Sequence, residues 1–158
     1  MYRRCSGVIL IFVLMKWPVS AQDDGANYKN RICVGLGGEN GYLGADYSRD
    51  IYRSKFYVGI GCGLGTGWTG YVRYEPLNWK GLRPFVSSGA AYSFGGTLTE
   101  SAGTSVFSSS AGLNYMPGRR RRKALVLGIG LTYYSILKGE TKGAINGWGP
   151  LIKAGLAF

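Results

Sequence analysis

The sequence predicts an all-β fold, an eight-stranded antiparallel up-and-down β-barrel. Glycine accounts for 27 of the 158 residues and proline for only 5. Such a composition disfavours long helices and suits closely spaced strands joined by tight turns. Large and small side chains alternate from Lys123 to Tyr134, KALVLGIGLTYY. A period of two residues is typical of a strand, because successive side chains point to opposite faces.

The same segment predicts that the barrel crosses a membrane. The small residues on the opposite face of this strand offer little for another protein surface to pack against. The large apolar residues therefore require an apolar partner that needs no reciprocal packing, and lipid is such a partner. At about 3.3 Å per residue and a tilt near 45°, a strand of this length spans roughly 28 Å, enough for the apolar band of a transmembrane barrel. The large residues are Leu125, Leu127, Ile129, Leu131 and Tyr133.

Residues 1–21 are predicted to be a cleavable signal peptide that precedes the barrel domain. Arg3 and Arg4 form a positive region, residues 7–15 form an apolar run, and residues 19–21 (VSA) resemble a cleavage site. The run is too short to span a bilayer as a helix, and residues 16–18 (KWP) interrupt it, which argues against an uncleaved anchor.

The mature chain, residues 22–158, has the length of one domain. Removal of Arg3, Arg4 and Lys16 leaves 16 of the 19 basic residues against 8 acidic ones, a net charge of +8. In an exported protein this excess favours membrane headgroups, lipopolysaccharide or peptidoglycan as partners over nucleic acid.

Eight strands can be assigned, and an outward stripe of apolar side chains continues from strand to strand. The strands are residues 29–37, 41–48, 55–64, 67–75, 83–94, 106–116, 123–134 and 149–158. Besides the seventh strand, the stripe comprises Ile32, Val34, Leu36; Leu43, Ala45, Tyr47; Phe56, Val58, Ile60, Cys62, Leu64; Trp68, Val72, Tyr74; Phe107, Ala111, Leu113, Tyr115; and Ile152, Ala154, Leu156, Phe158. Only the fifth strand is ambiguous, because both of its parities carry aromatic and small residues.

With both termini placed in the periplasm, the connections alternate between the two sides of the membrane. The inner turns would be residues 49–54, 76–82 and 117–122. The outer loops would be residues 38–40, 65–66, 95–105 and 135–148, of which the last two have the length that such barrels favour on the outside.

The inward parity places five charged side chains inside the barrel, which we expect to form a structural ion network: Arg31, Asp46, Arg73, Glu75 and Lys153. The interior of an eight-stranded barrel is just filled by side chains, and an unpaired buried charge costs several kcal/mol. We therefore expect a polar plug without an open pore. Polar companions on this parity are Tyr42, Tyr57, Tyr71, Ser108, Ser110 and Asn114.

Cys33 is expected to face inward and Cys62 outward on non-adjacent strands, so both are predicted to be free thiols. The chain has no histidine, which excludes Ser-His-Asp and Cys-His arrangements and any histidine-containing zinc site. A Ser-Lys or Asp/Glu mechanism remains open, but no constellation of residues points to one. We expect no enzymatic activity, no cofactor and no metal.

Two short motifs invite functional interpretations. The stretch GIGCGLGTG, residues 59–67, does not fit a phosphate-binding loop, because Thr66 stands where a glycine is needed. Its glycines more plausibly give room to inward tyrosines. The basic turn RRRRK follows Pro117 and is expected to meet anionic headgroups at the membrane edge, or lipopolysaccharide if the orientation is inverted. Its residues are Arg119, Arg120, Arg121, Arg122 and Lys123.

The 12 tyrosines and 4 tryptophans gather near the ends of predicted strands. Amphipathic rings settle at a membrane interface, so they predict two aromatic girdles. Members of the girdles are Tyr47, Trp68, Tyr74, Trp79, Tyr115, Tyr133 and Trp148.

The end of the chain, GWGPLIKAGLAF, resembles the last strand of bacterial outer-membrane β-barrels, which ends in an aromatic residue that the barrel-assembly machinery recognises. Phe158 matches the terminal position, and Leu156 replaces the aromatic residue common two places earlier. WTGYVRYEP, RPFVSSGAAYSF and SAGLNYMP are also similar to small barrels of the outer membrane protein beta-barrel domain family, of OmpA/OmpX type. The resemblance implies an outer-membrane location and transfers no active site.

We expect a monomeric outer-membrane barrel with a structural or surface-interaction role, whose partners are the lipid bilayer, lipopolysaccharide and, during biogenesis, the assembly machinery. One alternative is a secreted calycin-like barrel that binds a small apolar ligand; it would turn Leu125 and Ile129 inward and expose Arg31, Arg73 and Glu75. Another alternative is a histidine-free lipid-modifying enzyme of the outer membrane.

Overall fold

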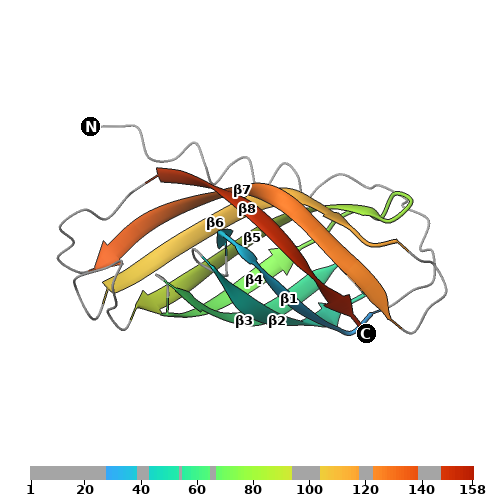
Figure 1. Cartoon of the computed structure of the whole chain (residues 1–158), viewed down its shortest axis with the longest axis horizontal. Coiled ribbons are helices and arrows are strands. Elements are labelled where there is room, and N and C mark those ends of the chain that lie inside the picture. The colour runs from blue at the N-terminus through green and yellow to red at the C-terminus, as the bar shows by residue number, and fades with distance from the viewer. Residues whose placement is uncertain are drawn as a thin grey trace.

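The described residues form one closed β-barrel in which each strand pairs with its neighbours in the sequence (Figure 1). The computed structural model describes residues 28–38, 43–53, 55–64, 67–93, 104–117, 123–138 and 147–158. The strands are β1 (Asn30–Leu36), β2 (Leu43–Tyr52), β3 (Phe56–Leu64), β4 (Gly67–Tyr74), β5 (Leu82–Ser93), β6 (Thr104–Tyr115), β7 (Ala124–Lys138) and β8 (Gly147–Ala157). This confirms the predicted eight-stranded antiparallel up-and-down barrel.

Several sequence predictions lie outside the described residues. They concern the signal peptide at residues 1–21, Tyr42, the loop at residues 65–66, most of the loops at residues 95–105 and 135–148, and Arg119 to Arg122. Among the residues that the structure does describe, no helix is long and apolar enough to cross a membrane.

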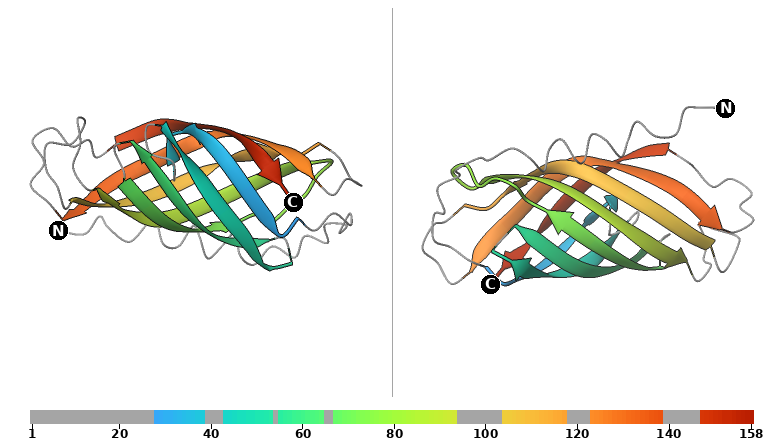
Figure 2. Two further views of the ribbon diagram at one scale, coloured as in Figure 1. Left: turned by 60° about the horizontal axis from the view of Figure 1, so that its bottom comes forward. Right: turned by 180° about the vertical axis from the view of Figure 1, so that it is seen from behind.

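Antiparallel pairing of β1 with β8 closes the barrel. The two strands run in register from Arg31 opposite Ala157 to Leu36 opposite Ile152. Beyond this ladder, Asn30 and Phe158 exchange two backbone hydrogen bonds of 2.9 Å each. Both ends of the barrel sequence therefore lie at one end of the molecule, which we call the terminus end; the opposite end is the far end. Figure 2 shows the strands slanting across the long axis on every side.

Side chains on the two parities of each strand have opposite environments. The apolar stripe is exposed: Ile129 is 63% exposed and Leu125 is 46% exposed. Arg31 and Arg73 are fully buried, and Glu75 is 2% exposed. The calycin-like alternative required the reverse arrangement and is therefore wrong. Cys33 is buried and Cys62 is exposed, and both are free thiols as predicted.

The fifth strand, which the sequence left ambiguous, takes its parity from its neighbours. Val86 pairs with Tyr74 of β4 and with Ala111 of β6, so it joins their outward row. As a result, Arg83 and Phe85 point inward and are buried.

Most predicted strand boundaries differ from the structure, by up to four residues, and three of these differences have a local cause. β1 ends at Leu36 because Gly37 and Gly38 adopt positive φ angles of 74° and 62°, which leave the extended conformation. β2 continues to Tyr52 through a register shift after Asp50, so the inner turn is shorter than residues 49–54. β7 continues to Lys138 because it pairs with the beginning of β6, so the outer loop begins after residue 138 and not at residue 135.

Glycines on the inward parity make room for large side chains, as predicted for the stretch at residues 59–67. A Cβ atom placed on Gly59 would lie 2.3 Å from Cζ and 2.5 Å from the hydroxyl of Tyr71. The absent side chain of Gly59 on β3 is therefore what allows the Tyr71 ring on β4 to lie inside the barrel.

We predict that Gly59→Ala destabilises the barrel by about 1–3 kcal/mol, the usual cost of overpacking a filled interior. Gly70→Ala is the matched control on the neighbouring strand, because Gly70 is exposed and an added Cβ there would meet nothing within 4 Å. Urea unfolding followed by tryptophan fluorescence measures both variants. Equal midpoints for the two would contradict the packing role of Gly59.

Candidate functional site

The charged groups of the interior begin at the terminus end with a buried ion pair between β1 and the residue that follows β4. Arg31 donates two hydrogen bonds to Glu75, at 2.5 Å from Nη1 to Oε1 and 2.8 Å from Nη2 to Oε2. The Arg31 guanidinium also lies 3.8 Å from the centre of the Tyr57 ring. Two parallel bonds to a carboxylate, with a ring beneath, hold the guanidinium in one orientation.

Glu75 accepts further contacts from two more strands. Asn114 of β6 donates from Nδ2 to Oε1 at 2.7 Å. Arg83 of β5 places Nη1 3.9 Å from Oε2. One carboxylate therefore connects four parts of the barrel wall. Because the group is buried, each of these contacts is electrostatically stronger than it would be in water.

A second group lies farther from the terminus end. Tyr71 donates a hydrogen bond of 2.5 Å to Asp46. The guanidinium of Arg73 lies 5.0 Å from the centre of the Tyr71 ring and 5.1 Å from that of Phe85. Nζ of Lys153 lies 4.7 Å from the same Phe85 ring. Aromatic faces thus accompany both cations, in the geometry of cation–π contacts.

The five charged residues assigned to the interior from the sequence are all buried: Arg31, Asp46, Arg73, Glu75 and Lys153. The two carboxylates belong to different groups, since Glu75 meets Arg31 and Asp46 meets Tyr71. Sequence reasoning missed Arg83 and Phe85, because the parity of their strand could not be read. Their pairing partners on β4 and β6 would have revealed that parity.

The described interior side chains are held by contacts between strands. Within the described parts of the chain, no three side chains among Cys, Asp and Glu come together in a group that could hold a metal ion. Nearer the far end, Ser110 and Thr132 share a hydrogen bond of 2.9 Å, and both are buried. This hydrogen bond joins the neighbouring strands β6 and β7.

The outer wall is apolar along its middle and aromatic towards both ends. At the far end, Tyr133 and Trp148 are register partners whose ring centres lie 5.3 Å apart. At the terminus end, Phe56 and Tyr74 lie 4.6 Å apart. Other outward rings are Tyr47, Tyr52, Trp79, Tyr115 and Phe158 at the terminus end, and Trp68, Tyr92 and Phe107 at the far end.

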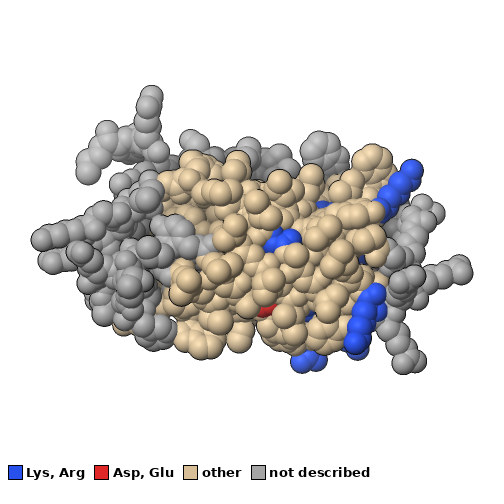
Figure 3. Space-filling model, viewed as in Figure 1, with Lys and Arg blue, Asp and Glu red and all other residues tan. Residues whose placement is uncertain are grey.

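The most exposed charged residues of the described chain are basic and lie at the terminus end, where Figure 3 shows Lys and Arg atoms at the right of the molecule; Asp50 at this end is half-buried. Lys123 of the predicted basic turn is among them, whereas Arg119 to Arg122 lie outside the described residues. The exposed cations are Lys29, Arg49, Arg53, Lys55, Lys80 and Lys123. In the described residues, the rim at the terminus end is therefore strongly basic.

We predict that Arg31→Ala lowers the free energy of unfolding by about 3–5 kcal/mol, because it leaves the buried Glu75 carboxylate without its bidentate partner. Lys29→Ala is the control, since Lys29 is exposed two residues away. The temperature at which the barrel loses its compact gel mobility measures both variants. Replacement of both Arg31 and Glu75 by Met should recover part of the loss. A normal transition for Arg31→Ala alone would contradict the structural role of the pair.

Comparison of the chain with models of known protein families, with curated proteins and with solved structures finds no match. The structure shows a closed eight-stranded antiparallel barrel, and no match supports the expected membership of the OmpA/OmpX-type family.

Proposed function

We propose that this chain is a small integral barrel of the bacterial outer membrane, monomeric and without enzymatic activity, with a structural or surface-interaction role. The observation that carries the proposal is the inverted distribution of side chains: the apolar stripe is exposed and the charged groups are buried. Water outside such a wall would face a continuous hydrocarbon surface, whereas lipid matches it.

The spacing of aromatic residues supports a membrane position. Trp148 and Phe158 share the outward parity of β8 and are separated by ten residues. At about 3.3 Å per residue this is roughly 33 Å along the strand, or roughly 23 Å across a membrane at a tilt of 45°. The apolar band of outer-membrane barrels is about 25 Å tall.

The filled interior supports a role without conduction. Arg31, Arg73 and Tyr57 are fully buried inside a barrel of eight strands. Barrels of this size have room only for their own side chains or one small ligand. In this proposal the interior groups stabilise the wall, and interaction with lipopolysaccharide or other surface partners takes place at the far-end loops.

The last strand supports a role for the carboxyl end in assembly. Leu156 and Phe158 face outward, with 51% and 42% of their surface exposed. They remain accessible to an assembly machinery before lipid surrounds the wall. Phe158 also joins Asn30 across the closing seam, so recognition and closure involve the same residue.

The location can be tested by fractionation. We predict that the mature chain stays with the outer-membrane fraction after carbonate washing, requires detergent for extraction, and migrates faster unheated than heated on a gel. A control periplasmic protein should be released without detergent. Recovery of the mature chain in the soluble periplasmic fraction would contradict the membrane proposal.

The assembly signal can be separated from the seam by comparing three variants. Deletion of Phe158 and Phe158→Ala should both reduce the amount of inserted barrel several-fold, because both remove the aromatic ring. Phe158→Tyr should insert normally. Phe158→Ala retains the backbone hydrogen bonds with Asn30, so normal insertion of this variant would show that the ring is not the signal.

A further inference from the structure

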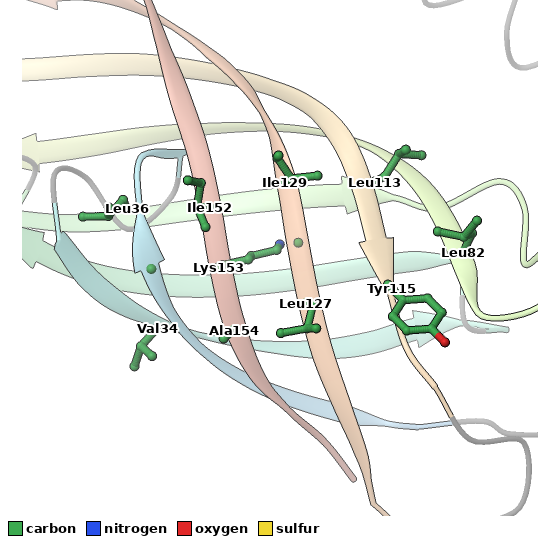
Figure 4. A pocket seen from close by; sticks show the side chains of 12 residues that line it. Val34, Leu36, Leu82, Leu113, Tyr115, Leu127, Ile129, Ile152, Lys153 and Ala154 are labelled. Carbon is green, nitrogen blue, oxygen red and sulfur yellow. The ribbon is translucent and has the colours of Figure 1, made fainter.

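A shallow apolar groove of about 480 Å³ crosses the outer wall over β6, β7, β8 and β1 (Figure 4). The register explains its form. One row of outward side chains follows successive pairs across the strands: Leu82, Tyr115, Leu127, Ala154 and Val34. A second row lies two residues away from the first on each strand, towards the far end, and consists of Leu113, Ile129, Ile152 and Leu36.

The floor of the groove is the wall between the two rows, where Gly128 and Gly35 flank Lys153 in the register. Neither glycine has a side chain, and the Lys153 chain turns inward beneath Gly128, where an added Cβ would lie 2.7 Å from its Cε. In the first row, Ala154 is the small residue between the larger side chains of Val34 and Leu127.

The direction of the groove follows from where each residue stands in its strand. Leu82 is the first residue of β5, at the terminus end, whereas Val34 and Leu36 stand near the far end of the short strand β1. The groove thus rises from the basic rim into the apolar middle of the wall.

Two exposed cations lie on the terminus side of the groove lining: Lys80 precedes Leu82 by two residues, and Lys123 precedes Leu127 by four. Lys80 lies in the tight turn in which Trp79 and Leu82 exchange two backbone hydrogen bonds of 2.9 Å, with Lys80 and Gly81 at φ angles of 50° and 89°. Lys123 precedes β7 and is exposed like Leu125 and Leu127, the alternate residues that follow it. In the proposed membrane position, these cations would lie near the lipid headgroups and the groove would extend from them into the hydrocarbon.

We propose that the groove holds one acyl chain of an anionic phospholipid whose phosphate lies at Lys80 and Lys123. This inference rests on the proposed membrane location and adds a specific lipid site to it. Charge complementarity selects the anionic headgroup, and the apolar rows accept its hydrocarbon chain. A second copy of the chain is a poorer occupant, because symmetric pairing in one membrane would bring two basic rims together.

The site can be tested with the refolded mature protein, with Trp68 and Trp148 replaced by phenylalanine so that Trp79, adjacent to Lys80, is the fluorescent reporter. The protein is inserted into phosphatidylcholine vesicles that contain a small amount of one brominated lipid, either phosphatidylglycerol or phosphatidylcholine. In both brominated lipids the bromine is near the glycerol end of one acyl chain. At low salt we expect brominated phosphatidylglycerol to quench Trp79 with an apparent affinity about 10- to 30-fold higher than brominated phosphatidylcholine does. The difference comes from the attraction of two lysines to the anionic headgroup. Added salt should reduce the difference.

Two pairs of variants locate the effect. Ala154→Phe fills the groove and should remove the preference, whereas Ala90→Phe, at an exposed position of β5 away from the groove, should retain it. Lys80→Gln with Lys123→Gln should also remove it, whereas Arg53→Gln with Lys55→Gln, at another part of the basic rim, should not.

Equal quenching by the two lipids would overturn this inference while leaving the membrane proposal in place. Quenching by neither lipid would instead contradict the membrane proposal. A preference that survives Ala154→Phe would overturn the groove as the site. A dimer in detergent that Ala154→Phe converts to a monomer would assign the groove to a second copy and overturn the lipid assignment.

Discussion

The rest of the structure depends on one requirement: the charged side chains inside the closed barrel must find hydrogen-bond or ion-pair partners there, because the apolar side chains face outward. Glu75 meets this requirement for the terminus end, because it accepts two bonds from Arg31 and one from Asn114 and lies within 3.9 Å of Arg83. These residues come from β1, β6 and β5, so one carboxylate fixes the mutual position of strands that are not all neighbours. A buried charge without such partners would destabilise the fold by several kcal/mol.

Side-chain volume is the second constraint on the interior. Large residues such as Tyr57, Tyr71 and Arg73 are buried together, and the paired position on an adjacent strand can carry a glycine that leaves them room. Gly59 supplies that space for Tyr71, and Gly128 supplies it for Lys153 and Asn114. The alternation of large and small residues in the strands therefore serves both surfaces, since the large parity covers the outside and the small parity admits the polar groups within.

The outer wall combines three features that fit one environment. Aromatic rings lie towards both ends, aliphatic residues cover the middle, and exposed basic residues of the described chain gather at the terminus end. In a bilayer these would meet the interfaces, the hydrocarbon and the phosphate groups of one leaflet. The groove over β6 to β1 connects two of these zones, which is why it suits a lipid with a charged head and an apolar chain.

The pattern of residues was enough to predict the number of strands, their order and the parity of seven of them, because a period of two residues assigns alternate side chains to opposite faces. It also predicted that Arg31, Asp46, Arg73, Glu75 and Lys153 lie inside, since each is on the inward parity of its strand. The parity of β5 depends on its neighbours in the folded barrel, because RPFVSSGAAYSF offers similar side chains on both faces. Register across strands likewise decided which charges meet: Arg31 and Glu75 are 44 residues apart, and no local pattern encodes their pairing or the alignment of the rows that form the groove.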